Sequence, residues 1–72
     1  MDYADRIYSL RQTHGLTRKQ LAEGAGLSIE GIKGYERRSR KPAYDVLLSL
    51  SNFFNVSIDY LVGRSSNPAR LP

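Results

Sequence analysis

The chain has 72 residues, no cysteine and a formal net charge of +4. A chain this short forms one domain that buries only about 60% of its unfolded surface, and neither disulfides nor thiolate metal sites can reinforce its core. Its start lacks the basic and apolar segments of a signal peptide, and no apolar run approaches the roughly 18 residues that span a bilayer. We therefore expect a cytoplasmic protein without membrane contact.

The first predicted element is a helix that begins near Tyr3 and stops at His14-Gly15. Tyr3, Ile7 and Leu10 recur at helical spacing. Gly15 can adopt the left-handed conformation that ends a helix. The only histidine, His14, is therefore predicted to cap this helix rather than to act as a general base.

Two short helices are predicted next, over 18–25 and 29–37, with a turn at Gly26 between them. Thr17 and Ser28 each stand directly before one of these helices, where a hydroxyl can accept a hydrogen bond from a free backbone amide. Helices joined by so short a turn cross steeply, and this spacing is typical of a helix-turn-helix. The exposed face of the second helix, which suits a DNA major groove, is predicted to carry Ile29, Glu30, Lys33 and Gly34.

Two further helices are predicted after Pro42. The fourth ends at Asn55, and its apolar face consists of Val46, Leu47, Leu50, Phe53 and Phe54. Ser57 begins the fifth helix and Gly63 ends it. Residues 64–72 contain two prolines and no periodicity, so we expect a disordered tail.

These elements predict an all-α, five-helix domain over 1–63, followed by the tail 64–72. No alternating run long enough for a strand is present. The predicted core comprises Ile7, Leu10, Leu16, Leu21, Ala22, Leu27, Ile32, Tyr35, Val46, Leu47, Leu50, Phe54, Ile58 and Leu61.

Positive charge is concentrated in residues 17–41, which have a net charge of +4, while residues 1–16 sum to zero and residues 42–62 to −2. The basic residues of this segment are Arg18, Lys19, Lys33, Arg37, Arg38, Arg40 and Lys41. Because the charge coincides with the helix-turn-helix pattern, it indicates a polyanionic partner.

From Ile7 to Gly63 the chain resembles the Cro/repressor-type helix-turn-helix domains, also called the xenobiotic-response-element family. The matching stretches are LRQTHGLTRKQLA, AGLSIEGIKGYERRSRKP and LLSLSNFFNVSIDYLVGR. The resemblance implies a lambda-repressor-like fold in which the second and third helices form the helix-turn-helix. It also implies a sequence-specific regulator of transcription, most often a repressor, that binds an inverted repeat in double-stranded DNA as a homodimer.

The expected DNA contacts are Arg18, Lys19, Ser28, Ile29, Glu30, Lys33, Arg37, Arg38, Arg40 and Lys41. Arg18 stands where the family commonly has glutamine, and we expect it to bind a phosphate. Ile29 and Glu30 match positions that read bases in the family. Ile29 can contact a thymine methyl group, and Glu30 can accept a hydrogen bond from a cytosine amino group.

Three small residues depart from a typical pattern. Gly31 and Gly34 each cost roughly 1 kcal/mol relative to alanine inside a helix. Either DNA or a partner approaches the backbone closely there, or binding orders the helix, and the sequence leaves both readings open. Ala43 stands where the family often has a capping serine, and alanine cannot cap.

Two other classes of function compete with DNA binding. A protein-binding module, such as an antitoxin or the partner of a regulator, would keep the same fold, and the glycines of the third helix favour it slightly. An enzyme is not expected, because His14 lacks a neighbouring nucleophile and the string GAGLSIEG does not match a phosphate-binding loop. No cluster has metal-ligand spacing, so we predict neither a metal nor another cofactor.

Overall fold

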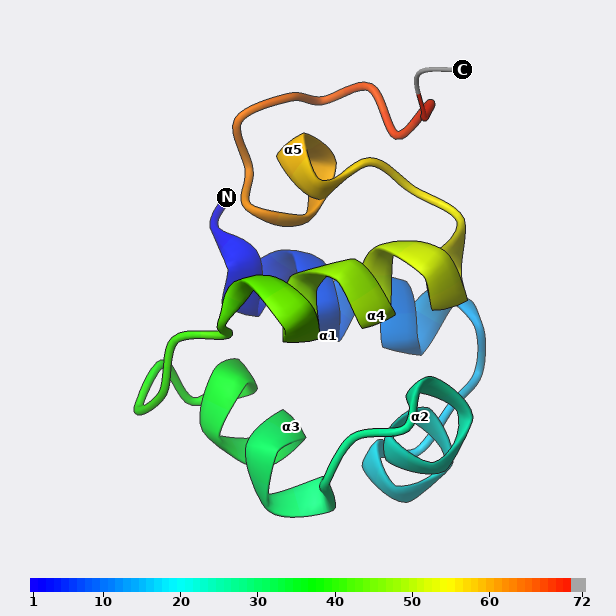
Figure 1. Cartoon of the computed structure of the whole chain (residues 1–72), viewed down its shortest axis with the longest axis vertical. Coiled ribbons are helices and arrows are strands. Elements are labelled where there is room, and N and C mark those ends of the chain that lie inside the picture. Colours follow the sequence, from blue (N-terminus) through cyan, green and yellow to red (C-terminus); the bar gives the residue numbers. More distant parts are fainter. Residues whose placement is uncertain (71–72) are drawn as a thin grey trace.

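The computed structural model describes residues 1–70, which form five helices. In chain order they are α1 (Tyr3–Thr13), α2 (Arg18–Ala25), α3 (Ile29–Glu36), α4 (Tyr44–Phe54) and α5 (Ile58–Leu61). Residues 1–70 contain no strand, so the predicted all-α, five-helix architecture is confirmed. Figure 1 shows α2 and α3 on one side of α1 and α4, with α5 on the other side.

The predicted hydroxyl caps are present. The Thr17 Oγ1 accepts a hydrogen bond from the amide of Gln20 at 3.1 Å, and the Gln20 Oε1 accepts one from the amide of Thr17 at 2.9 Å. Ser28 and Ser57 each accept a hydrogen bond from the amide three residues later, at 3.0 Å in both cases. Ala43 provides no side-chain cap for α4, as expected. Local side-chain chemistry thus sets where three of the helices begin.

The core lies where α1, α2, α3, α4 and α5 meet. Its buried members are Ile7, Leu21, Ala22, Ile32, Tyr35, Leu50, Phe54, Val56 and Leu61. Val56 is buried although it was not among the predicted core residues. Six predicted core residues are only half-buried: Leu10, Leu16, Leu27, Val46, Leu47 and Ile58. His14 caps α1 as predicted, with its Nδ1 2.8 Å from the carbonyl oxygen of Leu10.

Two tyrosines that the sequence left unassigned differ in their surroundings. The ring of Tyr60 lies under the guanidinium of Arg6, 3.6 Å from the ring centroid, and so joins α5 to α1. Tyr44 is 69% exposed at the start of α4. Tyr60 therefore contributes to packing, while Tyr44 belongs to the surface.

The segment after α5 folds back on the domain as far as Arg70, and the expected disorder of residues 64–72 stays a prediction. The amide of Ser57 donates a hydrogen bond to the carbonyl of Pro68 at 3.0 Å, and Arg70 Nη2 donates one to Asn52 Oδ1 at 2.8 Å. The amide before α5 needs an acceptor, and the returning chain supplies it. Residues 71–72 belonged to the same expectation and lie outside the described residues.

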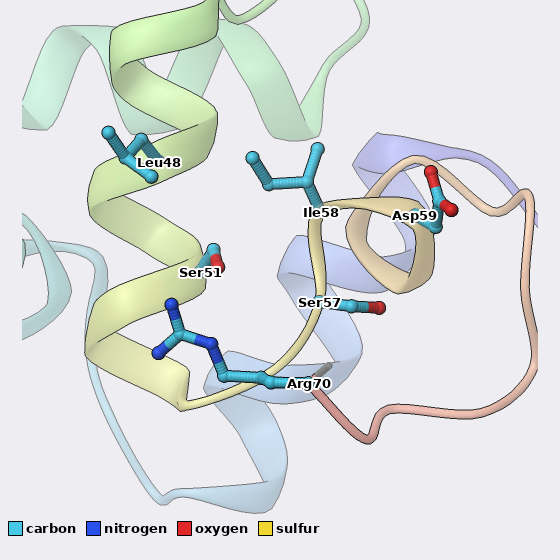
Figure 2. A pocket seen from close by; sticks show the side chains of 6 residues that line it. All are labelled: Leu48, Ser51, Ser57, Ile58, Asp59 and Arg70. Carbon is cyan, nitrogen blue, oxygen red and sulfur yellow. The ribbon is translucent and has the colours of Figure 1, made fainter. Parts of the chain in front are cut away.

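Arg70 also borders a surface hollow of about 310 Å³ between α4 and α5. Leu48 and Ile58 line its apolar side, and Ser51, Ser57 and Asp59 complete the lining (Figure 2). The hollow is a shallow groove on the side of the molecule that carries the tail.

Two glycines with positive φ provide a test of the packing at the end of α5. Gly26 (φ 70°) has open space where a Cβ would stand, whereas a Cβ on Gly63 (φ 82°) would collide with the backbone carbonyl of Met1. Gly26→Ala should lower the free energy of unfolding by about 1–2 kcal/mol, the cost of the left-handed conformation. Gly63→Ala should cost clearly more, because the Met1 backbone must also move. Urea unfolding would measure both, and equal losses would contradict the packing of Met1 on Gly63.

Candidate nucleic-acid interface

The turn between α2 and α3 has the predicted helix-turn-helix geometry. Gly26 is left-handed, and the amide of Leu27 donates a hydrogen bond to the carbonyl of Ala22 at 2.8 Å. Ala22 is 4% exposed and Ile32 is fully buried, so the two helices approach closely at a small residue. One face of α3 is consequently left on the outside of the pair.

Three of the four residues predicted for the outer face of α3 lie there. Glu30 is exposed, and Ile29 and Lys33 are both half-buried. Part of the Ile29 side chain packs against the core. The Lys33 Nζ lies 3.5 Å from Glu30 Oε1, so the two side chains form an ion pair one turn apart. An apolar group, a carboxylate and an ammonium group are therefore presented side by side.

Gly34 is the exception, since it is buried rather than exposed. A Cβ at this position would lie 2.5 Å from Cδ of Arg40, whose side chain covers the glycine. The Gly34 carbonyl accepts hydrogen bonds from the amides of Ser39 at 3.0 Å and Arg40 at 3.2 Å. The chain's own loop thus explains this glycine, and neither a close DNA backbone nor ordering on binding is needed.

A buried carboxylate joins the first three helices. Glu36 at the end of α3 is only 3% exposed in its side chain, and Arg11 of α1 donates to it from Nε at 2.7 Å and Nη2 at 3.0 Å. Arg11 Nη1 donates to the carbonyl of Leu16 at 2.9 Å. The hydrogen bonds from Arg11 to Glu36 raise the pKa of Arg11 further above its ordinary value.

This network was missed in the sequence, where Arg11 and Glu36 were counted only as charges. One signal was available, because Arg11 follows Ala4 and Ile7 at spacings that place all three on the buried face of α1. The sequence around Glu36 carries no similar spacing that would indicate a buried side chain. A buried charged residue at such a position requires an opposite charge from elsewhere in the chain.

Arg18, the predicted phosphate ligand, is also tied to this carboxylate. Its Nε donates to Glu36 Oε1 at 3.1 Å, while its side chain remains 39% exposed. The Nε of Arg18 is therefore hydrogen-bonded within the protein, while part of its side chain is open to solvent. A phosphate contact by Arg18 stays a prediction, now with an internal partner that orients it.

Arg38 is engaged by the start of α1. Its Nε donates to Asp2 at 2.8 Å, and its Nη2 donates to Asp2 at 3.1 Å and to Asp5 at 2.8 Å. The same two aspartates form a capping box at α1 that the sequence analysis did not identify. Arg38 lowers the pKa of Asp2 to about 2, with a smaller contribution from the amide of Asp5. The aspartates in turn raise the pKa of Arg38.

The remaining basic candidates are on the surface. Lys19, Arg37 and Lys41 are exposed, and none of them forms a salt bridge within residues 1–70. Ser28 is exposed too, and its hydroxyl oxygen already accepts the capping hydrogen bond from Gly31. The structure thus brings Ser28, Ile29, Glu30 and Lys33 together on α3, while Arg38 points to α1 and Arg40 covers Gly34.

Other kinds of site find no support in the described part of the chain. Residues 1–70 contain no group of three or more histidine, aspartate or glutamate side chains placed to hold a metal ion. Within the same residues, no helix is long and apolar enough to cross a membrane.

The buried network predicts a large loss of stability when its carboxylate is neutralised. Glu36→Gln leaves two arginines side by side without their counter-charge, which should lower the free energy of unfolding by about 3–5 kcal/mol. Glu23→Gln, at an exposed position of α2, is the matched control and should change it by less than about 0.5 kcal/mol. Chemical denaturation would measure both, and similar small effects would show that the network contributes little.

The contact between Asp2 and Arg38 predicts a pH effect. Because the folded pKa of Asp2 is depressed from 3.8 to about 2, its stabilising contribution is complete above about pH 4 and is lost as the pH falls toward 2. Arg38→Gln should therefore raise the pKa of Asp2 most of the way back to its ordinary value. Carboxyl NMR titration would follow this change, and Arg37→Gln should leave the pKa where it was. An unchanged pKa in Arg38→Gln would contradict the contact.

Known proteins match this chain in sequence and in fold. Residues 7–61 match the helix-turn-helix family. The chain is 41% identical over 66 residues to the uncharacterised helix-turn-helix transcriptional regulator YobD of Bacillus subtilis, covering 92% of this chain and 59% of YobD. It is 42% identical over 64 residues to the regulator ImmR of the same species, covering 89% of this chain and 50% of ImmR.

The P22 c2 repressor, solved in complex with a synthetic operator, superimposes with a TM-score of 0.82 at 28% identity, covering 90% of this chain and 98% of the repressor chain. The present chain spans half to three-fifths of the length of the curated relatives YobD and ImmR. The five helices, the turn at Gly26 and these matches agree. The chain belongs to the helix-turn-helix family of the Cro/repressor type.

Proposed function

We propose that this chain is the DNA-binding part of a transcriptional regulator that recognises a specific double-stranded sequence. The observation that carries the proposal is the outer face of α3, which presents Ile29, Glu30 and Lys33 and is followed in the chain by the exposed cations Arg37 and Lys41. A helix that presents mixed chemistry beside cations without internal partners suits a major groove bordered by phosphates. The names of the similar Bacillus subtilis proteins, which are transcriptional regulators, support the same class.

Sequence reading is assigned to the first turn of α3. Ile29 would contact a thymine methyl group, and the Glu30 carboxylate would accept from a cytosine amino group. Lys33 offsets part of the repulsion between Glu30 and the DNA, since its ammonium group is paired with that carboxylate. Ser28, Lys19, Arg37 and Lys41 would contact the backbone, which positions the protein without reading bases.

We further propose that two copies of the chain bind an inverted repeat as a homodimer and act as a repressor. A two-fold dimer places its recognition helices about 34 Å apart, one turn of DNA. Three apolar residues of α4 are exposed, Tyr44 at 69%, Leu48 at 40% and Phe53 at 36%. Leu48 lines the hollow together with Ile58 (Figure 2). Apolar side chains exposed in this way favour contact with a second copy.

A protein-binding module remains the second candidate, but its main support is weaker than the sequence indicated. It rested on the glycines of α3, and Gly34 is occupied by the chain's own Arg40. A non-enzymatic role fits either candidate.

Binding to duplex DNA tests the proposal directly. Fluorescence anisotropy with a random duplex and with DNA from upstream of the chain's own gene, between roughly 50 and 200 mM salt, should show salt-dependent binding that is tighter for one sequence. Sedimentation of the complex should give two chains per operator. Absence of binding at the lowest salt would reject the DNA proposal and favour a protein partner.

Glu30 predicts a change in base preference. Glu30→Gln should alter discrimination at one base pair of the operator by about 1–3 kcal/mol and leave the other positions unchanged. Glu23→Gln removes the same charge at an exposed position of α2 and is the control for a general electrostatic effect. A uniform gain for all sequences in both variants would show that Glu30 reads no base.

A further inference from the structure

The start of α1 and the loop after α3 are joined by a compact set of polar contacts. Arg38 donates three hydrogen bonds to Asp2 and Asp5, at 2.8, 3.1 and 2.8 Å. The hydroxyl of Tyr3 donates a fourth contact to the carbonyl of Arg40 at 3.2 Å. Residues more than thirty positions apart in the chain are therefore connected at the edge of the candidate interface.

Arg38 adopts an unusual backbone conformation. Its φ is 63°, in the left-handed region that side chains with a Cβ rarely occupy. Such a conformation persists only where the surroundings hold it. Here the two carboxylates hold the side chain, and the amides of Ser39 and Arg40 are turned back to the carbonyl of Gly34.

The charge of this cluster also differs from that of the rest of the loop. Arg38 faces two carboxylates, so the cluster as a whole is not positive, and three of the five N–H groups of its guanidinium donate to these carboxylates. Arg37, its neighbour in sequence, has no carboxylate partner within residues 1–70. Two adjacent arginines thus have different surroundings.

We propose that Asp2, Asp5 and Arg38 form a clasp that holds the 37–41 loop in the course needed for DNA binding, with Arg38 as a positioning residue that contacts no phosphate. The inference rests on the proposed DNA binding and assigns a role to the start of α1, which lies outside the helix-turn-helix. The clasp orients Arg37 and Lys41 at the end of α3 and removes one arginine from the charges available to DNA.

The test compares the same substitution at two neighbouring positions. Arg37→Gln should reduce the slope of log affinity against log salt by about 0.9, the value for one lost phosphate contact. Arg38→Gln should leave the slope unchanged, because Arg37 and Lys41 still reach the phosphates in the complex. It should weaken binding by a similar factor at every salt concentration, because the loop must then be ordered on binding. If Arg38→Gln flattens the slope as Arg37→Gln does, Arg38 contacts a phosphate and the proposal is overturned.

Hydrogen exchange provides a readout that does not depend on DNA. In Arg38→Gln the amides of Ser39 and Arg40 should exchange at least about tenfold faster relative to the amide of Leu21 inside α2, because the loop opens locally. Arg37→Gln should leave this ratio unchanged. Unaltered exchange in Arg38→Gln would mean that the loop needs no clasp and would overturn the proposal even if the wild-type protein binds DNA well.

Asp2→Asn tests the clasp by changing the acceptor of the Arg38 hydrogen bonds instead of the donor. Asparagine caps a helix about as well as aspartate, so α1 should keep its N-cap while the charged contact to Arg38 is weakened. The amides of Ser39 and Arg40 should again exchange faster. If the wild-type protein binds no DNA, the proposed function fails, and the exchange measurements still decide whether the clasp holds the loop.

Discussion

The carboxylate of Glu36 fixes the relative positions of α1, α2 and α3. It lies at the C-terminal end of α3, where the helix dipole disfavours a negative charge, and Arg18 lies at the N-terminal end of α2, where the dipole disfavours a positive one. Each placement alone costs about 0.3–1 kcal/mol near the surface. Brought within 3.1 Å of each other, with Arg11 on the other side of the carboxylate, the charges offset both penalties.

Such a network contributes geometry more than net stability. Desolvation of buried charges consumes much of the attraction between them, so a well-packed apolar cluster could be equally stable. An apolar cluster tolerates small rotations of its helices, whereas three hydrogen bonds to one carboxylate do not. Ala22 and Ile32 pack where α2 and α3 approach each other, and Glu36 links the end of α3 to the start of α2 through Arg18. These contacts define the angle between α2 and α3, and the direction of the outer face of α3 follows from that angle.

Much of the fold could be predicted from the sequence because its determinants are local. Thr17, Ser28 and Ser57 cap helices through hydroxyl groups, and helical periodicity identifies most of the buried apolar residues. The contacts that were missed join distant parts of the chain. The pairing of Glu36 with Arg11, the clasp on Arg38 and the carbonyl of Pro68 behind Ser57 depend on how the helices meet, and no local pattern encodes that.

The candidate site divides in the same way. The positions of Ile29, Glu30 and Lys33 follow from the start of α3, and they could be predicted from the cap at Ser28. The burial of Gly34 could not be predicted in this way. The side chain that covers it, Arg40, belongs to a loop whose course depends on α1. A glycine on an apparently exposed helix face can therefore mark a contact within the chain as readily as one with a ligand.

The same long-range contacts change how the positive charge of residues 17–41 should be counted. Arg18 shares Glu36, Lys33 is paired with Glu30, and Arg38 is held by two aspartates. Non-specific binding depends on cations that can release counterions from phosphates, at about 0.9 in salt slope for each contact. Residues whose charge is already compensated within the protein would add little to that term. In the proposed complex with DNA, the surface cations Lys19, Arg37 and Lys41 would supply attraction to any DNA, and α3 would supply the difference between one sequence and another.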